Sequence, residues 1–396
     1  MSFKKALKSA AGKVFQSRFY PNKKILLESI PDLSCQSFPV YEYMLKQGLN
    51  REYKLIWLVD DKKKFRDIHV KNVSFQNFEP QNIFQKIQRF YTLCTCRAML
   101  YDHRHIGKIF EKQLLVFLRH GTFIKSRLKH ANVHEVNESD LFVNTGKSFD
   151  QIDAEQLRLS ADKVIHTGFP NDDYLFEEKD YRTVMFPDEH FEKIILWMPT
   201  FRQNNNKSNG VQRIDSEFEF PLGLPCLYAK EDCEEVNRVL KEKNILLVLK
   251  PHPAQDLSFI KDFQLDHFRV LYDTDVAEKG IQLYQFLGSA DAMITDYSSV
   301  YYDYLLTDKS IALTVDDYEE YAEKTGFAVD YFKLIVGEYL KNKEDFIRYI
   351  EHVADGTDEL REKRRETRDF VYDYPDNHAT ERVYNILMQQ LKERYS

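Results

Sequence analysis

Two adjacent serines stand where a strand pattern gives way to a helix pattern. Ser298 and Ser299 follow the short apolar run 292–294, and apolar residues recur at helical spacing from Val300 onward. Backbone N–H groups are unpaired at a helix start, and two hydroxyls add further hydrogen-bond donors. The arrangement suits a phosphate or diphosphate, although serines also cap helices that bind no ligand.

A lysine and a histidine follow another predicted strand. The continuous apolar run 245–249 is typical of a buried parallel strand and leads into Lys250-Pro251-His252-Pro253. The two prolines exclude a helix, so they hold His252 in an extended turn at the carboxyl end of the strand. Ligands bind at this edge of open α/β sheets, which makes His252 a candidate ligand residue. For Lys250, simple solvation at a strand end is the alternative.

A second histidine, His120, follows the apolar run 114–118 after a single residue, Arg119, and precedes Gly121 and Thr122. The glycine allows a sharp backbone path at this point. Histidine accepts a proton near neutral pH, so His120 is a candidate general base. A histidine at a strand end is also commonly structural.

Other polar groups carry weaker signals. Asp273-Thr274-Asp275 has the spacing of an Asp-x-Asp metal motif, but we expect a loop there. Asp102, His103 and His105 could bind a metal, yet alternation at a strand end explains them equally well. The chain has no Walker loop and no Gly-x-Gly-x-x-Gly motif. A cradle of helix-start donors needs no divalent ion, so we expect no metal and no other cofactor.

Strand and helix patterns alternate along most of the chain, which predicts a doubly wound α/β fold with parallel sheets. Strands are expected at 24–28, 55–59, 98–101, 114–118, 141–143, 164–166, 194–198, 245–249, 269–272 and 292–294. Helices are expected at 38–45, 82–93, 231–243 and 281–289, and throughout 343–394.

The composition bounds the class of protein. The chain has 396 residues, enough for two domains of ordinary size, and its net charge of -7 argues against nucleic acid as a partner. No apolar run approaches the ~20 residues that span a bilayer, and lysines interrupt the N-terminal segment where a signal peptide would be apolar. The five cysteines form neither a disulfide framework nor a zinc pattern, so we expect a cytoplasmic protein.

The N-terminal segment 1–23 separates basic from apolar residues at helical spacing. Seven lysines and arginines precede the first acidic residue, Glu28. A basic amphipathic helix of this kind binds an anionic membrane surface, at about 1 kcal/mol per basic residue. The alternative is a helix that packs on its own domain with its lysines in solvent.

The turns around His252 and Ser298 together resemble those of the bacterial CDP-glycerol glycerophosphotransferases of teichoic acid and capsule synthesis. In that family a Lys-Pro-His-Pro turn and an Asp-Tyr-Ser-Ser helix start hold the cytidine diphosphate, and both runs are present here. The resemblance covers about residues 24–390 and implies a GT-B architecture of two Rossmann-like domains with the active site in the cleft between them. The expected segments are the N-terminal helix 1–23, an acceptor domain 24–170, a linker 171–192, a donor domain 193–375 and a C-terminal helix 376–396 that crosses back.

The resemblance also implies roles for the candidate residues. His120 becomes the general base, and His252 stabilises charge on the departing CMP. The donor diphosphate would be held by Lys250, Ser298, Ser299, Thr200 and Arg202. Further contacts in the cleft are expected from Gly121, Thr122, Lys125, Asp296, Glu381 and Arg382. Asp296 is expected to fix the helix start, because a carboxylate beside a diphosphate would repel it.

Several positions depart from the family pattern. Phe123 and Ile124 replace the Pro-Leu of its His-Gly-Thr-Pro-Leu-Lys turn, and its Gly-x-Pro-Arg-Asn-Asp run lacks the arginine, reading Gly-Phe-Pro-Asn-Asp over 168–172. Thr325 and Asn377 replace an arginine and a glycine. These changes leave the expected diphosphate cradle intact and bear on which polyol and which acceptor are used.

The resemblance implies transfer of a polyol phosphate, foremost glycerol phosphate, from a CDP-polyol to a hydroxyl of a lipid-linked glycan or growing cell-envelope polymer. The enzyme would act on the inner face of the membrane and release CMP. A sialyl-type GT-B transferase that uses a CMP-sugar is the first alternative, since such enzymes also carry His-Pro and Ser-Ser elements. A non-catalytic protein that binds a membrane surface is the second.

Overall fold

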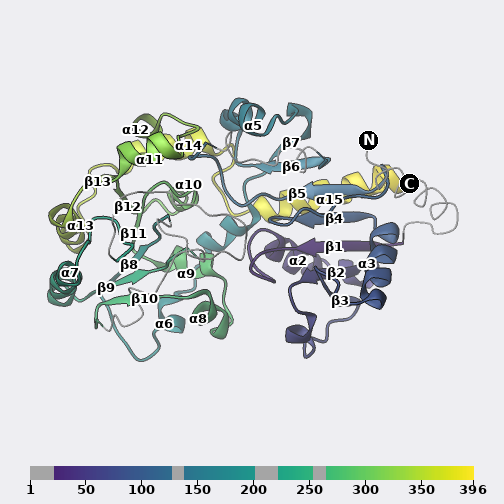
Figure 1. Ribbon diagram of the computed structural model, residues 1–396, viewed down its shortest axis with the longest axis horizontal. Helices are drawn as coiled ribbons and strands as arrows, with labels where there is room; N and C mark the ends of the chain where they lie inside the picture. Colours follow the sequence, from purple (N-terminus) through teal and green to yellow (C-terminus); the bar gives the residue numbers. More distant parts are fainter. Residues whose placement is uncertain (1–21, 127–137, 201–221, 253–264) are drawn as a thin grey trace. The chain divides into compact units, whose positions relative to one another are not determined.

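The computed structural model describes the whole chain except residues 1–21, 127–137, 201–221 and 253–264. The chain divides into two compact units. The first unit comprises 1–120, 130–173 and 372–396, and the second comprises 121–129 and 174–371, in both cases without the undescribed residues. Each unit contains one parallel sheet, so the expected α/β class with two Rossmann-like folds is confirmed (Figure 1). The expected helix over 1–23 lies almost wholly outside the described residues.

In the first unit, seven parallel strands run in the order β3-β2-β1-β4-β5-β6-β7. The strands are β1 (Lys24–Glu28), β2 (Lys54–Val59), β3 (Val73–Asn77), β4 (Ala98–Tyr101), β5 (Leu114–Phe117), β6 (Leu141–Asn144) and β7 (Val164–His166). The α-helices are α2 (Ser37–Lys46), α3 (Ile83–Thr95), α5 (Asp150–Leu157) and α15 (Ala379–Tyr395). Short 3-10 turns are η1 (Leu49–Arg51), η2 (Lys62–Phe65), η3 (Lys147–Phe149), η4 (Ala161–Lys163) and η5 (Pro170–Phe176), the last of which continues into the second unit.

Helices cover both faces of this sheet. On one face α2 and α15 pack against alternate strand residues, among them Trp57, which is fully buried. Phe75 of β3 packs against this core. Because side chains alternate along a strand, its neighbour Gln76 faces the other way and donates to Thr92 of α3 at 2.9 Å. The expected strands were apolar throughout because both faces of the sheet are covered.

In the second unit, six parallel strands run in the order β10-β9-β8-β11-β12-β13. They are β8 (Lys193–Trp197), β9 (Ile245–Leu249), β10 (Phe268–Val270), β11 (Ala292–Thr295), β12 (Ser310–Thr314) and β13 (Glu338–Leu340). The helices are α6 (Arg182–Met185), α7 (Lys230–Glu242), α8 (Asp273–Glu278), α9 (Leu283–Ser289), α10 (Val300–Leu305), α11 (Tyr318–Lys324), α12 (Tyr331–Leu334), α13 (Lys343–Asp355) and α14 (Arg361–Val371). Helices α7 and α13 pack on the core around Trp197, and every residue of α10 is buried.

Each sheet has one point where the strand order reverses, between β1 and β4 in the first unit and between β8 and β11 in the second. Chain connections leave such a pair of strands toward opposite sides, which opens a crevice beyond their carboxyl ends. Asp102 follows β4 directly, and Asp296 follows β11 directly. Candidate residues of both units therefore lie at or beside a switch point.

The structure differs from the sequence-based expectations at several elements. Strands β3, β12 and β13 were not expected, because their short runs mix apolar and polar residues. The stretch 171–192, expected as a linker, contains most of η5 and all of α6. Asp273 and Asp275 begin helix α8, so the expected loop there is wrong. The carboxylate of Asp275 accepts the backbone N–H of Tyr272 at 2.7 Å, which is a helix-capping contact.

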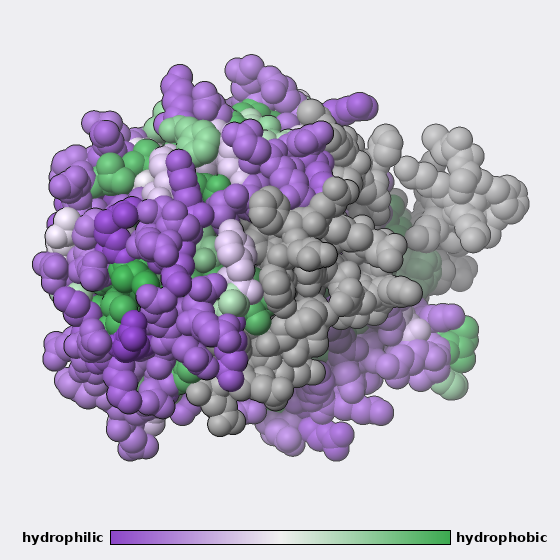
Figure 2. Space-filling view, turned by 60° about the vertical axis from the view of Figure 1, so that its left-hand side comes forward, coloured by the Kyte–Doolittle hydropathy of each residue, from purple (hydrophilic) through white to green (hydrophobic). Residues whose placement is uncertain are grey.

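On the face that Figure 2 shows, the coloured surface is mainly hydrophilic and its hydrophobic residues form small separate patches. Among the described residues, no helix is long and apolar enough to span a membrane. Helix α3 departs from the usual burial of apolar helix faces. Ile83, Phe84 and Ile87 share one side of this helix and are 62%, 80% and 60% exposed.

Candidate active site

His120 stands at the carboxyl end of the first sheet, three residues beyond β5, and its side chain is exposed. Its Nδ1 lies 2.7 Å from the backbone carbonyl oxygen of Asp102, which follows the neighbouring strand β4. A carbonyl oxygen only accepts, so Nδ1 carries the proton. In the neutral ring Nε2 then holds the lone pair, which is the form that a general base requires.

A buried ion pair supports this strand end. Arg119, immediately before His120, has a φ of 63° and is only 4% exposed. Its guanidinium donates to Asn144 Oδ1 at 3.2 Å and lies 3.0 Å from Asp153 Oδ1. Burial raises the pKa of the Asp153 carboxyl, while the Arg119 charge lowers it. Arg119 was not among the expected site residues, although a charged residue between an apolar strand and a candidate base is a usable signal.

Gly121 and the described residues that follow it, up to Ser126, belong to the second unit. Gly121 has a φ of +126°, and a Cβ atom added to it would lie 2.2 Å from Ser299 Oγ. The backbone therefore approaches the Ser299 side chain as closely as only glycine allows. Thr122 is 3% exposed, and its Oγ1 has no hydrogen-bond partner among the described residues. Such a buried hydroxyl is available to a ligand.

The segment 123–125 is held by backbone contacts with residues 327–328. Lys125 pairs with Phe327 in an antiparallel bridge, and Ala328 N–H donates to the carbonyl oxygen of Ile124 at 2.8 Å. Phe123 and Ile124 are 7% and 2% exposed. The two residues that depart from the family pattern therefore pack into the second unit and do not face a ligand.

Asp296 lies at the switch point of the second sheet, directly after β11, and is fully buried. Its carboxylate accepts the backbone N–H of Thr200 at 2.9 Å, the Thr200 hydroxyl at 2.7 Å and its neighbour Tyr297 N–H at 2.5 Å. Asp296 thus joins the end of β8 to the end of β11, in keeping with its expected structural role. The Thr200 hydroxyl donates its proton to Asp296, so Thr200 would position the turn and not donate to a phosphate.

Ser298 and Ser299 follow directly and are half-buried. Ser299 makes no capping hydrogen bond through its side chain. Lys250, at the end of β9, is 5% exposed, and its Nζ lies 2.9 Å from Asp273 Oδ1. That carboxylate neutralises much of the lysine charge, a pairing that the sequence did not reveal. His252 is exposed and is the last described residue before 253–264.

The remaining expected residues are Arg202, Glu381 and Arg382. Arg202 lies outside the described residues. Arg382 donates to Asp376 at 2.7 Å and to the carbonyl oxygen of Thr167 at 2.9 Å, so it fixes the start of α15 on the first unit. Glu381 is half-exposed beside His378, at 3.4 Å. These contacts give Arg382 a structural role within the first unit.

Metal-ligating groups come together at one place among the described residues. Ligand atoms of Cys35, Asp102 and His103 lie within 4.8 Å of one another. Cys35 was not an expected member of this group. His105 was expected in it, but its Nε2 lies 3.6 Å from Glu138 Oε2. The Asp102 carboxylate already accepts from His103 Nδ1 at 2.7 Å and from Ser37 N–H at 3.1 Å.

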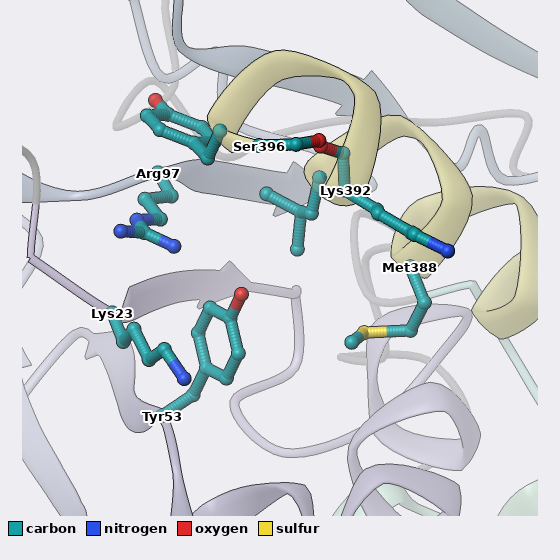
Figure 3. A pocket seen from close by; sticks show the side chains of 8 residues that line it. Lys23, Tyr53, Arg97, Met388, Lys392 and Ser396 are labelled. Carbon is teal, nitrogen blue, oxygen red and sulfur yellow. The ribbon is translucent and has the colours of Figure 1, made fainter.

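A cavity of about 220 Å³ lies at the opposite, amino-terminal edge of the first sheet (Figure 3). Lys23, Arg97 and Lys392 surround it, and Tyr53, Met388, Leu391, Tyr395 and Ser396 complete its lining. Two of its cations have partners, since Lys23 pairs with Glu52 at 2.9 Å and Arg97 lies over the Tyr395 ring at 4.5 Å. This cavity contains none of the candidate residues.

Two doubly wound parallel sheets, with candidate residues at their carboxyl edges, define a two-domain α/β protein of the Rossmann-like class. The chain belongs to the CDP-Glycerol:Poly(glycerophosphate) glycerophosphotransferase family, whose model matches residues 12–389.

Individual relatives agree with this membership. The chain is 22% identical over 400 residues to the teichoic acid glycerol-phosphate transferase of Staphylococcus aureus, covering 93% of this chain and 94% of the relative. It is 30% identical over 203 residues to the teichoic acid poly(ribitol-phosphate) polymerase of Bacillus spizizenii, covering 50% and 29%. The chain spans only 29% of the length of that polymerase, and only 29% and 44% of the lengths of two relatives from Bacillus subtilis.

Solved structures of the wall teichoic acid polymerase TagF share the fold. One superposes with a TM-score of 0.73 at 16% identity, covering 100% of this chain and 98% of that chain. Another, of a TagF variant soaked with CDPG, gives a TM-score of 0.72 at 15% identity and covers the same shares. The expected GT-B type of fold is confirmed by this match.

Proposed function

We propose that this chain transfers a polyol phosphate, foremost glycerol phosphate, from a CDP-polyol to a hydroxyl of a lipid-linked or growing cell-envelope polymer. The observation that carries the proposal is the hydrogen bond from His120 Nδ1 to the Asp102 carbonyl oxygen at 2.7 Å. It leaves the lone pair on Nε2 of an exposed histidine beyond the strand ends. Family membership supplies the substrate class, and relatives named for glycerol phosphate and for ribitol phosphate define the panel of donors.

In the proposed reaction the acceptor oxygen forms a bond to the β-phosphorus of the CDP-polyol. The bond between that phosphorus and the CMP oxygen breaks, the acceptor proton passes to His120 Nε2, and CMP leaves. An alcohol is a weak nucleophile until its proton is removed, and a positioned base contributes roughly 10²–10⁴ in rate. Ser298, Ser299, Lys250 and His252 would stabilise the diphosphate as charge develops on the leaving CMP.

The second unit offers suitable groups for that diphosphate. Ser299 Oγ makes no capping bond, and the Thr122 hydroxyl is buried without a partner among the described residues. Gly121 adds no side chain at this point, so its backbone can lie against Ser299. These donors carry no charge and hold their positions before the reaction, which favours binding of a phosphate by geometry.

The deciding measurement is CMP release from CDP-glycerol, CDP-ribitol and CMP-sialic acid, with membrane lipid acceptors present. We expect acceptor-dependent CMP from a CDP-polyol, and a drop of about 10²- to 10⁴-fold in His120→Gln with donor binding retained. Turnover with the CMP-sugar alone would support the sialyl-type alternative. If the protein bound membranes but neither turned over nor bound any donor, that result would support a non-catalytic surface protein.

We expect turnover without a divalent cation, because the proposed diphosphate ligands are hydroxyls, a lysine and a histidine. Excess chelator should leave CMP release unchanged. Loss of turnover in chelator, restored by Mg²⁺ or Zn²⁺, would contradict this expectation. The group of Cys35, Asp102 and His103 would then be the first place to look for the ion.

We further propose that the enzyme works at the inner face of the cell membrane and that α3 contributes to binding there. Ile83, Phe84 and Ile87 present three large apolar side chains to solvent on one side of this helix. Full burial of such a side chain stabilises by about 1.5–3 kcal/mol, so insertion at a lipid surface favours association. The basic pattern of 1–23 would add attraction to anionic lipid.

Sedimentation with vesicles of phosphatidylglycerol and phosphatidylcholine tests this location. Replacing Ile83, Phe84 and Ile87 together by serine should weaken vesicle binding at least about tenfold, given the area removed. The matched control is Phe370→Ser, since Phe370 is 55% exposed on α14 of the second unit. Equal binding by the triple variant and the wild type would refute a role for α3.

A further inference from the structure

The imidazole ring of His103 lies flat against that of His120. Their centroids are 4.2 Å apart, and the two planes differ by only 8°. Carbon atoms attract one another best at about 3.5–4.0 Å, so parallel rings at this spacing are in contact. His103 comes from the turn after β4, whereas His120 follows β5, so residues 17 positions apart meet at the carboxyl edge of neighbouring strands.

Asp102 holds both rings. Its backbone carbonyl oxygen accepts from His120 Nδ1 at 2.7 Å, and its carboxylate accepts from His103 Nδ1, also at 2.7 Å. The other carboxylate oxygen accepts the backbone N–H of Ser37, the first residue of α2, at 3.1 Å. Asp102 is fully buried, and burial raises the pKa of its carboxyl while the His103 hydrogen bond lowers it. The anchor of the two rings is therefore itself fixed by helix α2.

The backbone of the same turn is fixed independently. The buried carboxylate of Glu28, at the end of β1, accepts the backbone N–H of His103 at 3.2 Å and that of Arg104 at 3.0 Å. Arg104 Nε also donates to Glu28 at 2.8 Å. Because both the main chain and the Nδ1 atom of His103 are held, its ring has little freedom to move away from His120.

We infer that His103 is a positioning residue for His120, which rests on the proposed function because it takes His120 as the general base. The hydrogen bond at Nδ1 holds one side of the His120 ring. The parallel ring of His103, in contact with one face, limits rotation of the His120 ring and keeps Nε2 directed at one place. Misplacing a reacting group by about 1 Å can cost roughly 10²-fold in rate, so the stack matters for turnover.

Steady-state kinetics separate this role from donor binding. His103→Ala should lower kcat by about 10- to 100-fold while KM for CDP-glycerol changes less than about twofold. His103→Phe retains a flat ring without the bond to Asp102 and should recover most of the lost kcat. His105→Ala is the matched control, because His105 lies edge-on to Tyr101 at 80° and not on His120. In a His120→Gln background, His103→Ala should have no further effect.

A second readout is independent of turnover. Long-range ¹⁵N–¹H spectra of histidine-labelled protein distinguish a protonated Nδ1 from a protonated Nε2, and His120→Gln assigns the signals of His120. The wild type should show the Nδ1–H form alone, and His103→Ala should show a mixture of both forms. An unchanged His120 spectrum in His103→Ala would overturn the inference, whatever the kinetics show. The expected spectra without CMP release from any donor would support the positioning contact and reject the proposed function.

Discussion

Both sheets carry candidate residues at their carboxyl edges, but the chemical groups at the two edges differ. At the first edge, two imidazoles stack beside the buried carboxylates of Glu28 and Asp102, and burial raises the pKa of both carboxyls. At the second edge, the Asp296 carboxylate is engaged by three N–H or O–H groups from Thr200 and Tyr297. The proposed ligand groups there are the hydroxyls of Thr122, Ser298 and Ser299, together with Lys250 and His252 after β9.

This difference separates two tasks that a phosphoryl transferase must combine. Imidazoles can gain or lose a proton near neutral pH, whereas serine and threonine hydroxyls cannot. Substitutions at the first edge should therefore change kcat and its pH dependence. Substitutions of Asp296 or of the hydroxyl groups at the second edge should change donor affinity and leave the pH profile in place.

The largest effect at the second edge is expected from Gly121→Ala. The new Cβ would lie 2.2 Å from Ser299 Oγ and 2.8 Å from Ser299 Cβ, so either the loop or the serine must move. The left-handed φ of +126° adds strain of about 1–3 kcal/mol. We expect kcat/KM for the CDP-polyol to fall at least about 100-fold, mainly through weaker donor binding measured by calorimetry.

Gly280→Ala is the matched control for Gly121→Ala. Gly280 also has a positive φ, +66°, but a Cβ atom there would meet nothing within 4 Å. It carries the backbone strain without the clash, so it should lower stability slightly and leave donor binding intact. If both variants bound the donor like the wild type, the contact between Gly121 and Ser299 would have no part in binding.

A smaller effect is expected from Asp296→Asn. An amide nitrogen would then face N–H and O–H donors that now reach a carboxylate, and leaving a buried polar group unsatisfied costs about 1–3 kcal/mol. We expect the free energy of unfolding to fall by about 2 kcal/mol and donor affinity to weaken several-fold, with the pH profile of kcat unchanged. Urea unfolding and calorimetry measure the two quantities.

The control for Asp296→Asn is Asp266→Asn in the same unit. Asp266 pairs with Lys241 at 3.0 Å, but its side chain is 70% exposed, and exposed pairs contribute little. This variant should match the wild type in both measurements. A pH profile of kcat that moved in Asp296→Asn would contradict the division between the two edges.

The sequence predicted the parallel α/β class and most strands, because buried strands such as β9 are unbroken apolar runs. It also predicted that His120 and Ser299 follow strand ends. Periodicity does not say which way an apolar face points, so the outward side of α3 was not foreseen. Long-range pairs carry no local signal either, which is why the contacts of Lys250 with Asp273 and of His103 with His120 emerge only from the fold.

The smallest expected effect is on stability and comes from Asp308, which lies at neither edge. It tests whether changes in turnover are confined to the two edges. Asp308 accepts from Arg361 and Arg365 of α14, each at 2.6 Å, and these hydrogen bonds lower the pKa of its carboxyl to about 2. A carboxyl with a lowered pKa in the folded state stabilises the protein above its ordinary pKa near 3.8. That stabilisation disappears as the pH falls toward 2. Because Asp308 is partly exposed, we expect Asp308→Asn to cost about 1–2 kcal/mol at pH 7.

Urea unfolding of wild type and Asp308→Asn at pH 7 and at pH 2.5 measures this contribution. The difference in unfolding free energy should be largest at pH 7 and shrink at pH 2.5, because the wild-type carboxylate is then partly protonated. CMP release at pH 7 should be unchanged, since Asp308 anchors α14 and touches neither edge. A difference that stayed constant with pH would mean that the carboxylate charge adds nothing to stability. A change in kcat would mean that the first and second edges are not the only determinants of turnover.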